Sequence, residues 1–179
     1  MAILARINPF VEFLKPFKKK VPMRIVDYLN PSLVAFLDVS TQDEAIDALI
    51  DRLEGKLDDT ESFRQAIFQR ERLVSTGIGM GVAIPHAKMK NFTDFFIVVG
   101  IQRKKGLDWN GLDKIPVKLI FMIGGPEDRQ TEYLQILSLL TAAIKDAELR
   151  KELLKAASSE EVVALFTDFS HRIAKSHQI

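Results

Sequence analysis

Residues 70–88 of this chain read RERLVSTGIGMGVAIPHAK. Helical spacing ends in this stretch, three alternating glycines follow, and a short apolar run then leads to a histidine directly after a proline. Glycine favours turns and branched apolar residues favour strands, so this order predicts a helix, a turn and a strand over 82–84. We expect the strand to deliver His86 beside the glycine-rich turn.

His86 is the candidate nucleophile. A histidine with the ordinary pKa of about 6.5 is largely neutral near pH 7 and offers a nitrogen lone pair, so it attacks phosphorus without a separate base. Pro85 fixes the local backbone, and a carbonyl bonded to one ring nitrogen would leave the other free for in-line attack. A single histidine is more often an ordinary loop residue, but the neighbouring residues favour phosphoryl chemistry here. Lys88 either adds charge at this site or is an ordinary surface lysine.

Arg70 lies on an apolar stripe that helical spacing predicts to face inward. The stripe comprises Phe63, Ala66, Ile67, Arg70 and Val74. An inward charge needs a partner or an anion, and a guanidinium binds phosphate oxygens in pairs. The alternative, with equal weight from periodicity alone, is a side chain that extends its charged head into water.

Hydroxyls and glycines between Arg70 and His86 complete the candidate site. Ser75 and Thr76 either bind phosphate or close the helix end, as hydroxyls commonly do. Gly77 and Gly79 leave backbone N–H groups uncovered, which predicts an anion cradle. A nucleotide site is disfavoured, because nucleotide-binding glycines lie between a strand and a helix, whereas here the helix comes first.

The composition predicts one soluble domain. With 47% apolar and 27% charged residues, the 179-residue chain matches an ordinary globular protein. The net charge of +1 argues neither way about acidic partners, but the only dense basic run is at 18–20, and the lack of a clustered basic face makes nucleic acid an unexpected partner. The absence of cysteine excludes disulfides and thiolate metal sites and fits a reducing cytosol. No apolar run approaches the about 20 residues that cross a bilayer, and no secretory signal is apparent. We expect a cytoplasmic protein without cofactor or metal.

Three segments are expected along the chain: an amino-terminal appendage over 1–22, one domain over 23–170 and a polar tail over 171–179. The appendage mixes apolar residues with two prolines and the basic run. Residues 1–20 either contact an anionic membrane surface weakly or pack on the domain or a partner subunit. The other two histidines, His171 and His177, lie in the tail and are expected to be solvated.

The expected fold class is α/β, with a central mixed β-sheet and helices on both faces in three layers. Strands are predicted over 82–84, 94–101 and 117–123, and the last two are nearly continuous apolar runs, typical of strands covered on both faces.

Five helices are predicted. Thr41 with Glu44 forms a capping pair at the start of the first, and Ser158 with Glu161 marks the start of a short last helix. Helical apolar spacing places the five over 41–55, 60–74, 133–144, 149–154 and 158–166.

Residues 70–86 resemble the signature of enzyme IIA domains of the fructose, mannitol and nitrogen-regulatory class of the bacterial phosphotransferase system. Arg-Glu at one end, with Ser-Thr-Gly-Ile-Gly and Ala-Ile-Pro-His at the other, carry the resemblance, which extends over about 27–169 and is closest to the nitrogen-regulatory branch. It implies a type-2 IIA phosphocarrier, a phosphoprotein that receives a phosphoryl group on His86 from the phosphohistidine of a small carrier protein.

The resemblance also implies roles for the neighbouring residues. Arg70 matches the family's arginine beside the acceptor, and Ser75 and Thr76 match its hydroxyl pair. The family usually has a second histidine at the start of the helix after residue 126, where this chain has Tyr133. A phenol donates a hydrogen bond but adds no positive charge. We therefore include Tyr133 with His86 and Arg70 among the candidate catalytic residues.

Regulation of other proteins is the expected output, since the sequence contains no IIB cysteine and no membrane domain. Two alternatives stay open: a sugar-specific IIA that passes phosphate to a separate IIB, and a non-catalytic binding module on the same fold. The expected partners are a histidine-containing phosphocarrier protein as donor, and regulated transporters or kinases, or a separate IIB.

Overall fold

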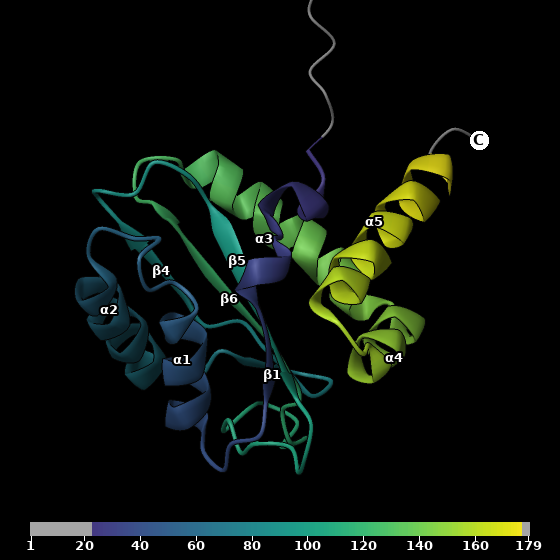
Figure 1. Cartoon of the computed structure of the whole chain (residues 1–179), viewed down its shortest axis with the longest axis horizontal. Helices are drawn as coiled ribbons and strands as arrows, with labels where there is room; N and C mark the ends of the chain where they lie inside the picture. The colour runs from purple at the N-terminus through teal and green to yellow at the C-terminus, as the bar shows by residue number, and fades with distance from the viewer. Residues whose placement is uncertain (1–22, 177–179) are drawn as a thin grey trace, which may run out of the picture.

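The fold is that of a computed structural model, in which residues 23–176 are described; the predicted appendage and His177 lie outside the described residues. In this part of the chain six strands form one mixed sheet with helices on both sides (Figure 1). The strands are β1 (Val34–Leu37), β2 (Gly77–Gly79), β3 (Val82–Ala83), β4 (His86–Met89), β5 (Phe96–Gln102) and β6 (Leu119–Pro126).

The sheet order explains why β5 and β6 are continuous apolar runs. β6 pairs antiparallel with β5, which pairs in parallel with β1. On its other side, β6 pairs in parallel with β3 and then with β4, while β2 pairs antiparallel with β3. The two central strands alternate their side chains between two separate cores, one on each face of the sheet. The sequence predicted both β5 and β6, and their observed ends differ from the predicted ends by one to three residues.

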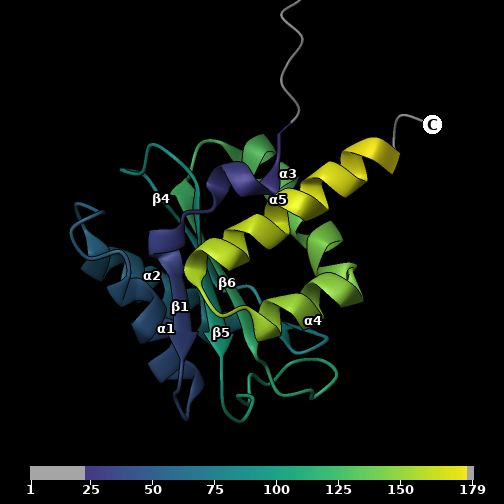
Figure 2. The ribbon, with the colours of Figure 1, turned by 45° about the vertical axis from the view of Figure 1, so that its right-hand side comes forward.

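Helices form the two outer layers. They are α1 (Gln42–Asp51), α2 (Thr60–Leu73), α3 (Gln130–Lys145), α4 (Ala147–Lys155) and α5 (Ser159–Ser176). α1 and α2 cover one face of the sheet, and α3, α4 and α5 cover the other, with α5 running obliquely across that face (Figures 1 and 2). The predicted three-layer α/β arrangement is confirmed.

Capping explains where two helices begin. Thr41 Oγ1 accepts from the Glu44 N–H at 3.2 Å, and Glu44 Oε2 accepts from the Thr41 N–H at 3.2 Å, so the predicted capping box is present. Ser158 Oγ likewise accepts from the Glu161 N–H at 3.2 Å.

The prediction of a short last helix is wrong. α5 has 18 residues, and Phe169 continues the buried stripe of Val162 and Phe166 beyond the predicted end at 166. His171 lies on this helix and is exposed, so the segment predicted as a polar tail begins inside α5.

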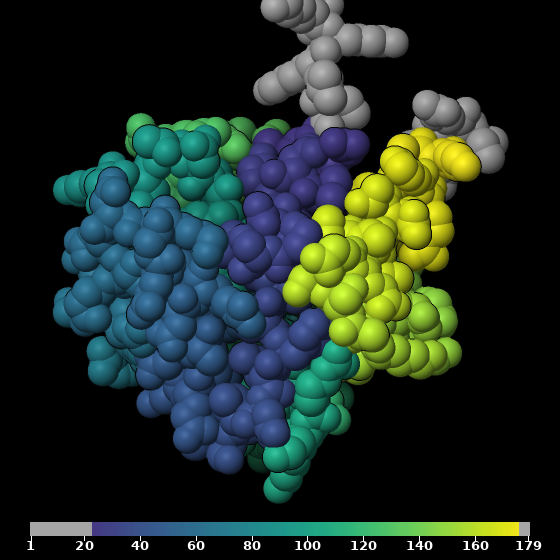
Figure 3. Space-filling model, viewed as in Figure 1, coloured from purple at the N-terminus to yellow at the C-terminus, as the bar shows by residue number. Residues whose placement is uncertain are grey.

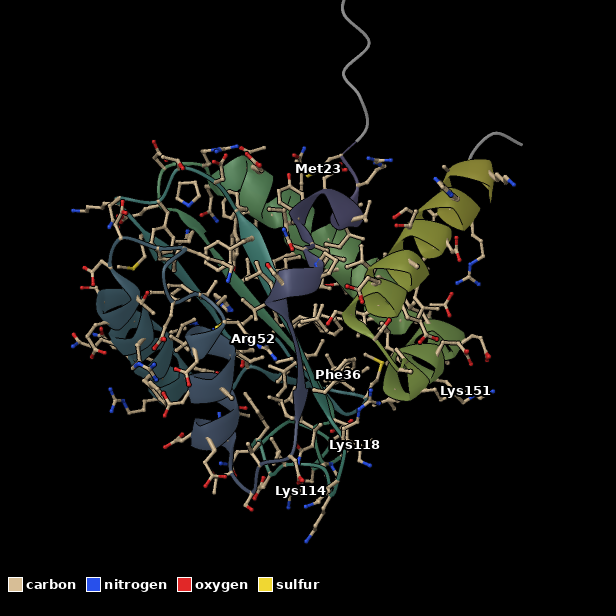
Figure 4. All side chains as sticks on the ribbon, in the orientation of Figure 1. Met23, Phe36, Arg52, Lys114, Lys118 and Lys151 are labelled. Carbon is tan, nitrogen blue, oxygen red and sulfur yellow. The ribbon has the colours of Figure 1, made fainter. Side chains whose placement is uncertain are left out.

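The first described residues fill the seam between the helical layers. Two short 3₁₀ helices, η2 (Ile25–Tyr28) and η3 (Pro31–Leu33), precede β1. In Figure 3 this purple segment lies between α1 and α2 on one side and α5 on the other. Met23 and Lys114 lie at opposite ends of Figure 4, so the described chain begins far from the loop over 106–116. Within residues 23–176, no helix combines the length and apolarity needed to cross a membrane.

Candidate active site

His86 is the first residue of β4, which is an edge strand among the described strands. Ile84 and Pro85 separate β3 from β4 along the same side of β6, and the Pro85 carbonyl accepts from the Ile123 N–H at 2.9 Å. Because β4 has no further strand beside it, helices of both layers reach its end: α2 brings Arg70 and α3 brings Tyr133 to His86. The site therefore lies at an open edge of the three-layer sandwich.

One hydrogen bond fixes the tautomer of His86. Its Nδ1 lies 2.9 Å from the Ile84 carbonyl oxygen. Because a carbonyl only accepts, Nδ1 of the neutral ring carries the hydrogen and Nε2 keeps its lone pair. Within residues 23–176, Nε2 has no hydrogen-bond partner. The ring is thus oriented with one nitrogen held and the other available.

The surroundings of His86 favour its neutral form. The ring is half-buried, and this burial is the main cause that lowers the pKa of His86 below its ordinary value. The Ile84 carbonyl and Glu71 act in the opposite direction, while the positive charges of Arg70 and Lys88 lower the pKa further. At pH 7 the imidazole is therefore neutral and nucleophilic.

Two clefts flank His86, and both His86 and Arg70 line each of them. The first, of about 420 Å³, also contains Ser75, Thr76 and Lys145. The remaining residues of this first cleft, mostly apolar, are Ile78, Met80, Ile84, Leu137 and Thr141. The second, of about 460 Å³, also contains Lys88, Glu127 and Tyr133, with Ala66, Gln69, Leu73 and Ala87. Arg70 is therefore the cation common to both sides of His86.

Arg70 is half-buried and closes the end of its own helix. Its Nη1 donates to the carbonyl of Val74, the residue that follows α2, at 2.9 Å. Carbonyls at a helix end lack intrahelical partners, and a nearby cationic side chain commonly supplies one. This bond uses one of the five guanidinium N–H groups, so the others remain for an anion in the clefts.

The hydroxyls of Ser75 and Thr76 are already occupied within the protein. Ser75 Oγ donates to the Trp109 carbonyl and accepts from the Gly77 N–H at 3.1 Å. Thr76 Oγ1 donates to Glu71 Oε2 at 2.6 Å. Since each hydroxyl has a single hydrogen, neither is free to donate to phosphate in this conformation. Binding of phosphate by this pair stays a prediction.

The glycines face a loop rather than His86, which differs from the predicted anion cradle. A Cβ on Gly77 would lie 3.0 Å from the Cα of Gly111, and one on Gly79 would lie 2.8 Å from Asp113 Oδ2. Gly79 also has φ of +91°, which favours glycine. Neither Gly77 nor Gly79 lines the clefts beside His86. The structure therefore explains both by close packing against the 106–116 loop.

Tyr133 lies beside His86, on α3. Its ring is buried, with its centroid 5.8 Å from that of His86, and Lys88 Nζ lies 5.1 Å from the Tyr133 centroid. Lys88 also donates to Gln130 Oε1. Burial raises the pKa of Tyr133, so the phenol keeps its hydrogen at neutral pH. Among the described residues the Tyr133 hydroxyl has no hydrogen-bond partner, so it is available as a donor.

Sequence reasoning did not select Glu71, Ile84 or Trp109. Glu71 accepts hydrogen bonds from Thr76 and Trp109, and Ile84 holds the His86 ring. The signal for Glu71 was its place next to Arg70 in the quoted motif. A backbone carbonyl such as that of Ile84 has no sequence signal.

Known proteins resemble this chain over the region that contains the site. A family model described as "Phosphoenolpyruvate-dependent sugar phosphotransferase system, EIIA 2" matches residues 27–169. The fructose-specific EIIABC component of Bacillus subtilis is 35% identical over 144 residues, which are 79% of this chain but only 22% of that protein. The fructose-specific EIIA component of Haloferax volcanii is 34% identical over 125 residues, 69% of this chain and 80% of that protein.

A solved structure shares the fold over almost its full length. The crystal structure of the nitrogen regulatory protein IIA-Ntr from Neisseria meningitidis superposes with a TM-score of 0.72 and 30% identity, covering 79% of this chain and 98% of that one. The resemblance found in the sequence is thus confirmed, and its relatives include both fructose-specific and nitrogen-regulatory proteins.

Proposed function

We propose that this chain, which belongs to the phosphoenolpyruvate-dependent sugar phosphotransferase system EIIA 2 family, receives a phosphoryl group on Nε2 of His86. The observation that carries this proposal is the hydrogen bond from His86 Nδ1 to the Ile84 carbonyl, which leaves Nε2 as the nucleophile beside Arg70. The donor is the phosphohistidine of a histidine-containing phosphocarrier protein, in keeping with the family resemblance.

The transfer needs no base from the protein. The Nε2 lone pair forms a bond to phosphorus while the bond from phosphorus to the donor's ring nitrogen breaks, and that electron pair stays on the donor ring. The His86 ring becomes positive while Nδ1 keeps its hydrogen. Because the Ile84 carbonyl oxygen lies 2.9 Å from Nδ1 and faces that hydrogen, its dipole stabilises the charge as it develops.

Arg70 and the α3 side of the site receive the negative charge of the phosphoryl group. Arg70 lines both clefts, so it lies beside the group in either one. We place the group in the second cleft, because Lys88 and Tyr133 line it and the Tyr133 ring centroid lies 5.8 Å from that of His86. Lys145 is the corresponding cation of the first cleft.

Regulation of other proteins is the output that we propose for this activity, in the cytoplasm and through the domain over 23–170. Its targets are transporters or kinases whose activity differs between the phosphorylated and free forms. The structural relationship to IIA-Ntr favours this function. Similarity to two fructose-specific proteins favours a second candidate, a IIA that passes phosphate to a separate IIB. Rapid loss of the label to a purified fructose IIB would select the second.

The proposal is tested by incubating the chain with phosphoenolpyruvate, the first kinase of the system and the carrier protein. We expect about one acid-labile phosphoryl group per chain, measured by intact mass, as a phosphohistidine requires. His86→Ala should lose the group completely. His171→Ala is the matched control, because His171 is exposed on α5 and lines neither cleft. A fully labelled His86→Ala variant, or no label on the unaltered chain, would contradict the proposal.

A further inference from the structure

Glu71 organises a polar cluster that the transfer chemistry above does not use. Its Oε1 accepts from the Thr76 N–H at 2.9 Å and from Trp109 Nε1 at 3.0 Å, and its Oε2 accepts from Thr76 Oγ1 at 2.6 Å. Thr76 and Trp109 are buried, with 4% and 1% of their surfaces exposed. Three hydrogen bonds to one carboxylate define a single arrangement for these groups, because bonds to an ionised acceptor are strong and directional.

Position on the helix separates the tasks of Glu71 and Arg70. Consecutive helical residues point about 100° apart, since one turn has 3.6 residues. Arg70 accordingly faces the clefts around His86, whereas Glu71 faces Trp109 in the 106–116 loop. The last turn of α2 thus presents a cation to the site and at the same time binds the segment that follows it.

A continuous chain of hydrogen bonds leads from Glu71 to the imidazole. Glu71 accepts from the N–H and the hydroxyl of Thr76, and the Thr76 carbonyl accepts from the Ile84 N–H at 3.0 Å. The Ile84 carbonyl in turn accepts from His86 Nδ1 at 2.9 Å. Ile84, whose carbonyl sets the His86 tautomer, is therefore held by Thr76, and Thr76 is held by Glu71.

We propose that Glu71 is a positioning residue that holds His86 in its nucleophilic orientation through Thr76 and Ile84. Its importance for phosphoryl transfer rests on the function proposed above, whereas its effect on the His86 ring does not. Removal of the carboxylate charge should loosen Thr76 and Ile84 and allow the imidazole to exchange between its two tautomers. A misplaced nucleophile should accept phosphate about 10-fold to 10²-fold more slowly.

The test compares Glu71→Gln with Glu61→Gln in the full chain. Glu61 lies on the same helix with 69% of its side chain exposed, so the control makes the same chemical change away from the cluster. Trp109 is the only tryptophan, so its indole N–H gives a single NMR signal that reports on the bond to Glu71. Imidazole ¹⁵N shifts of His86 report the tautomer, and single-turnover labelling from the phosphorylated carrier gives the transfer rate.

In Glu71→Gln we expect three changes: an upfield shift of the indole proton, ¹⁵N shifts of His86 that average two tautomers, and the slower transfer. Glu61→Gln should match the unaltered chain. The proposal is overturned if the chemical shift of the Trp109 indole proton does not change in Glu71→Gln. It is also overturned if that shift changes while the His86 tautomer and the transfer rate do not. If the unaltered chain takes no phosphoryl group but Glu71→Gln still changes the His86 tautomer, the positioning role stands and the proposed function fails.

Thr76→Val is a second variant for the case in which Glu71→Gln does not fold. It removes the bond from Thr76 Oγ1 to Glu71 Oε2 and the bond that Thr76 Oγ1 accepts from Trp109 Nε1 at 3.2 Å, and it keeps the backbone bonds of residue 76. We expect the same changes in His86, but smaller. A Thr76→Val chain that folds and leaves the tautomer and the rate unchanged would count against the relay through Thr76.

Discussion

The two helices beside His86 hold their polar groups in opposite ways. At the end of α2, Arg70 and Glu71 are bonded to the segment that follows the helix. At the start of α3, the Tyr133 hydroxyl has no partner among the described residues, and Lys88 lies over its ring. The α2 side is thus assembled without a ligand, whereas on the α3 side the Tyr133 hydroxyl is available to donate to one, beside a Lys88 that donates to Gln130.

Among the predicted effects on phosphoryl transfer, the largest is expected from substitution of Arg70 on the α2 side. Arg70→Ala should slow phosphoryl transfer to His86 by about 10²-fold or more, the usual effect of removing a group that stabilises developing charge. Arg70→Lys should recover only part of the rate, because an ammonium cannot contact two phosphate oxygens in parallel. Rapid-quench transfer kinetics measure both. Transfer at the unaltered rate in both variants would mean that Arg70 only closes α2 through Val74.

The α3 side is tested next at Tyr133. If its free hydroxyl binds the phosphoryl group, Tyr133→Phe should weaken the phosphorylated form by about 1 to 3 kcal/mol, the scale of a hydrogen bond to a charged group. Tyr133→His should speed acceptance or lengthen the lifetime of the phosphorylated form, since a protonated imidazole adds positive charge. Transfer and hydrolysis are measured for all three chains. If the transfer rate and the hydrolysis rate are the same in the unaltered chain and both variants, Tyr133 takes no part in the chemistry.

A smaller effect should distinguish the two clefts. Lys88→Met keeps most of the aliphatic stem but removes the charge, and should slow transfer about fivefold, because a partly exposed cation contributes about 1 kcal/mol. Lys145→Met is the matched control, since Lys145 lines only the first cleft. The transfer rates of both variants are measured by the rapid-quench kinetics used for Arg70. A slow Lys145→Met variant beside an unaffected Lys88→Met variant would move the phosphoryl group to the first cleft.

The smallest effect is expected from pH. Burial lowers the pKa of His86 below its ordinary value, so the ring is already neutral at pH 7, and raising the pH to 8 should not increase its neutral fraction appreciably. Lowering the pH should protonate His86 only below the range where a free histidine titrates. An imidazole ¹⁵N titration measures this directly. A His86 midpoint above that of a free histidine would show that Glu71 and the Ile84 carbonyl outweigh burial, Arg70 and Lys88.

Local patterns were sufficient to predict most of the fold. The Thr41–Glu44 capping box and the apolar runs of β5 and β6 are properties of contiguous sequence, and the structure confirms them. β1, β2 and β4 were not predicted as strands. The four residues of β4, HAKM, show no apolar run and pair with only one described strand. The residue pattern selected His86 and Arg70, which line both clefts, and the family resemblance added Tyr133, which lines the second.

Contacts between distant segments account for what sequence reasoning missed. The need for glycine at 79 depends on Asp113, and the partners of Ser75 and Glu71 include Trp109, all more than 30 residues away. No local pattern contains that information, so the glycines suggested an anion cradle and Glu71 received no role. The tautomer of His86 likewise depends on a backbone carbonyl, whose direction only the folded chain defines.

The most direct test of the account is the position of phosphorus on the His86 ring. After phosphorylation of the ¹⁵N-histidine-labelled chain, two-dimensional ¹H–¹⁵N and ³¹P NMR identify which ring nitrogen is bonded to phosphorus. Because Nδ1 donates its hydrogen to the Ile84 carbonyl oxygen 2.9 Å away, we predict a phosphorus coupling at Nε2 and a protonated Nδ1. Phosphorus on Nδ1, or on any residue other than His86, would contradict the account.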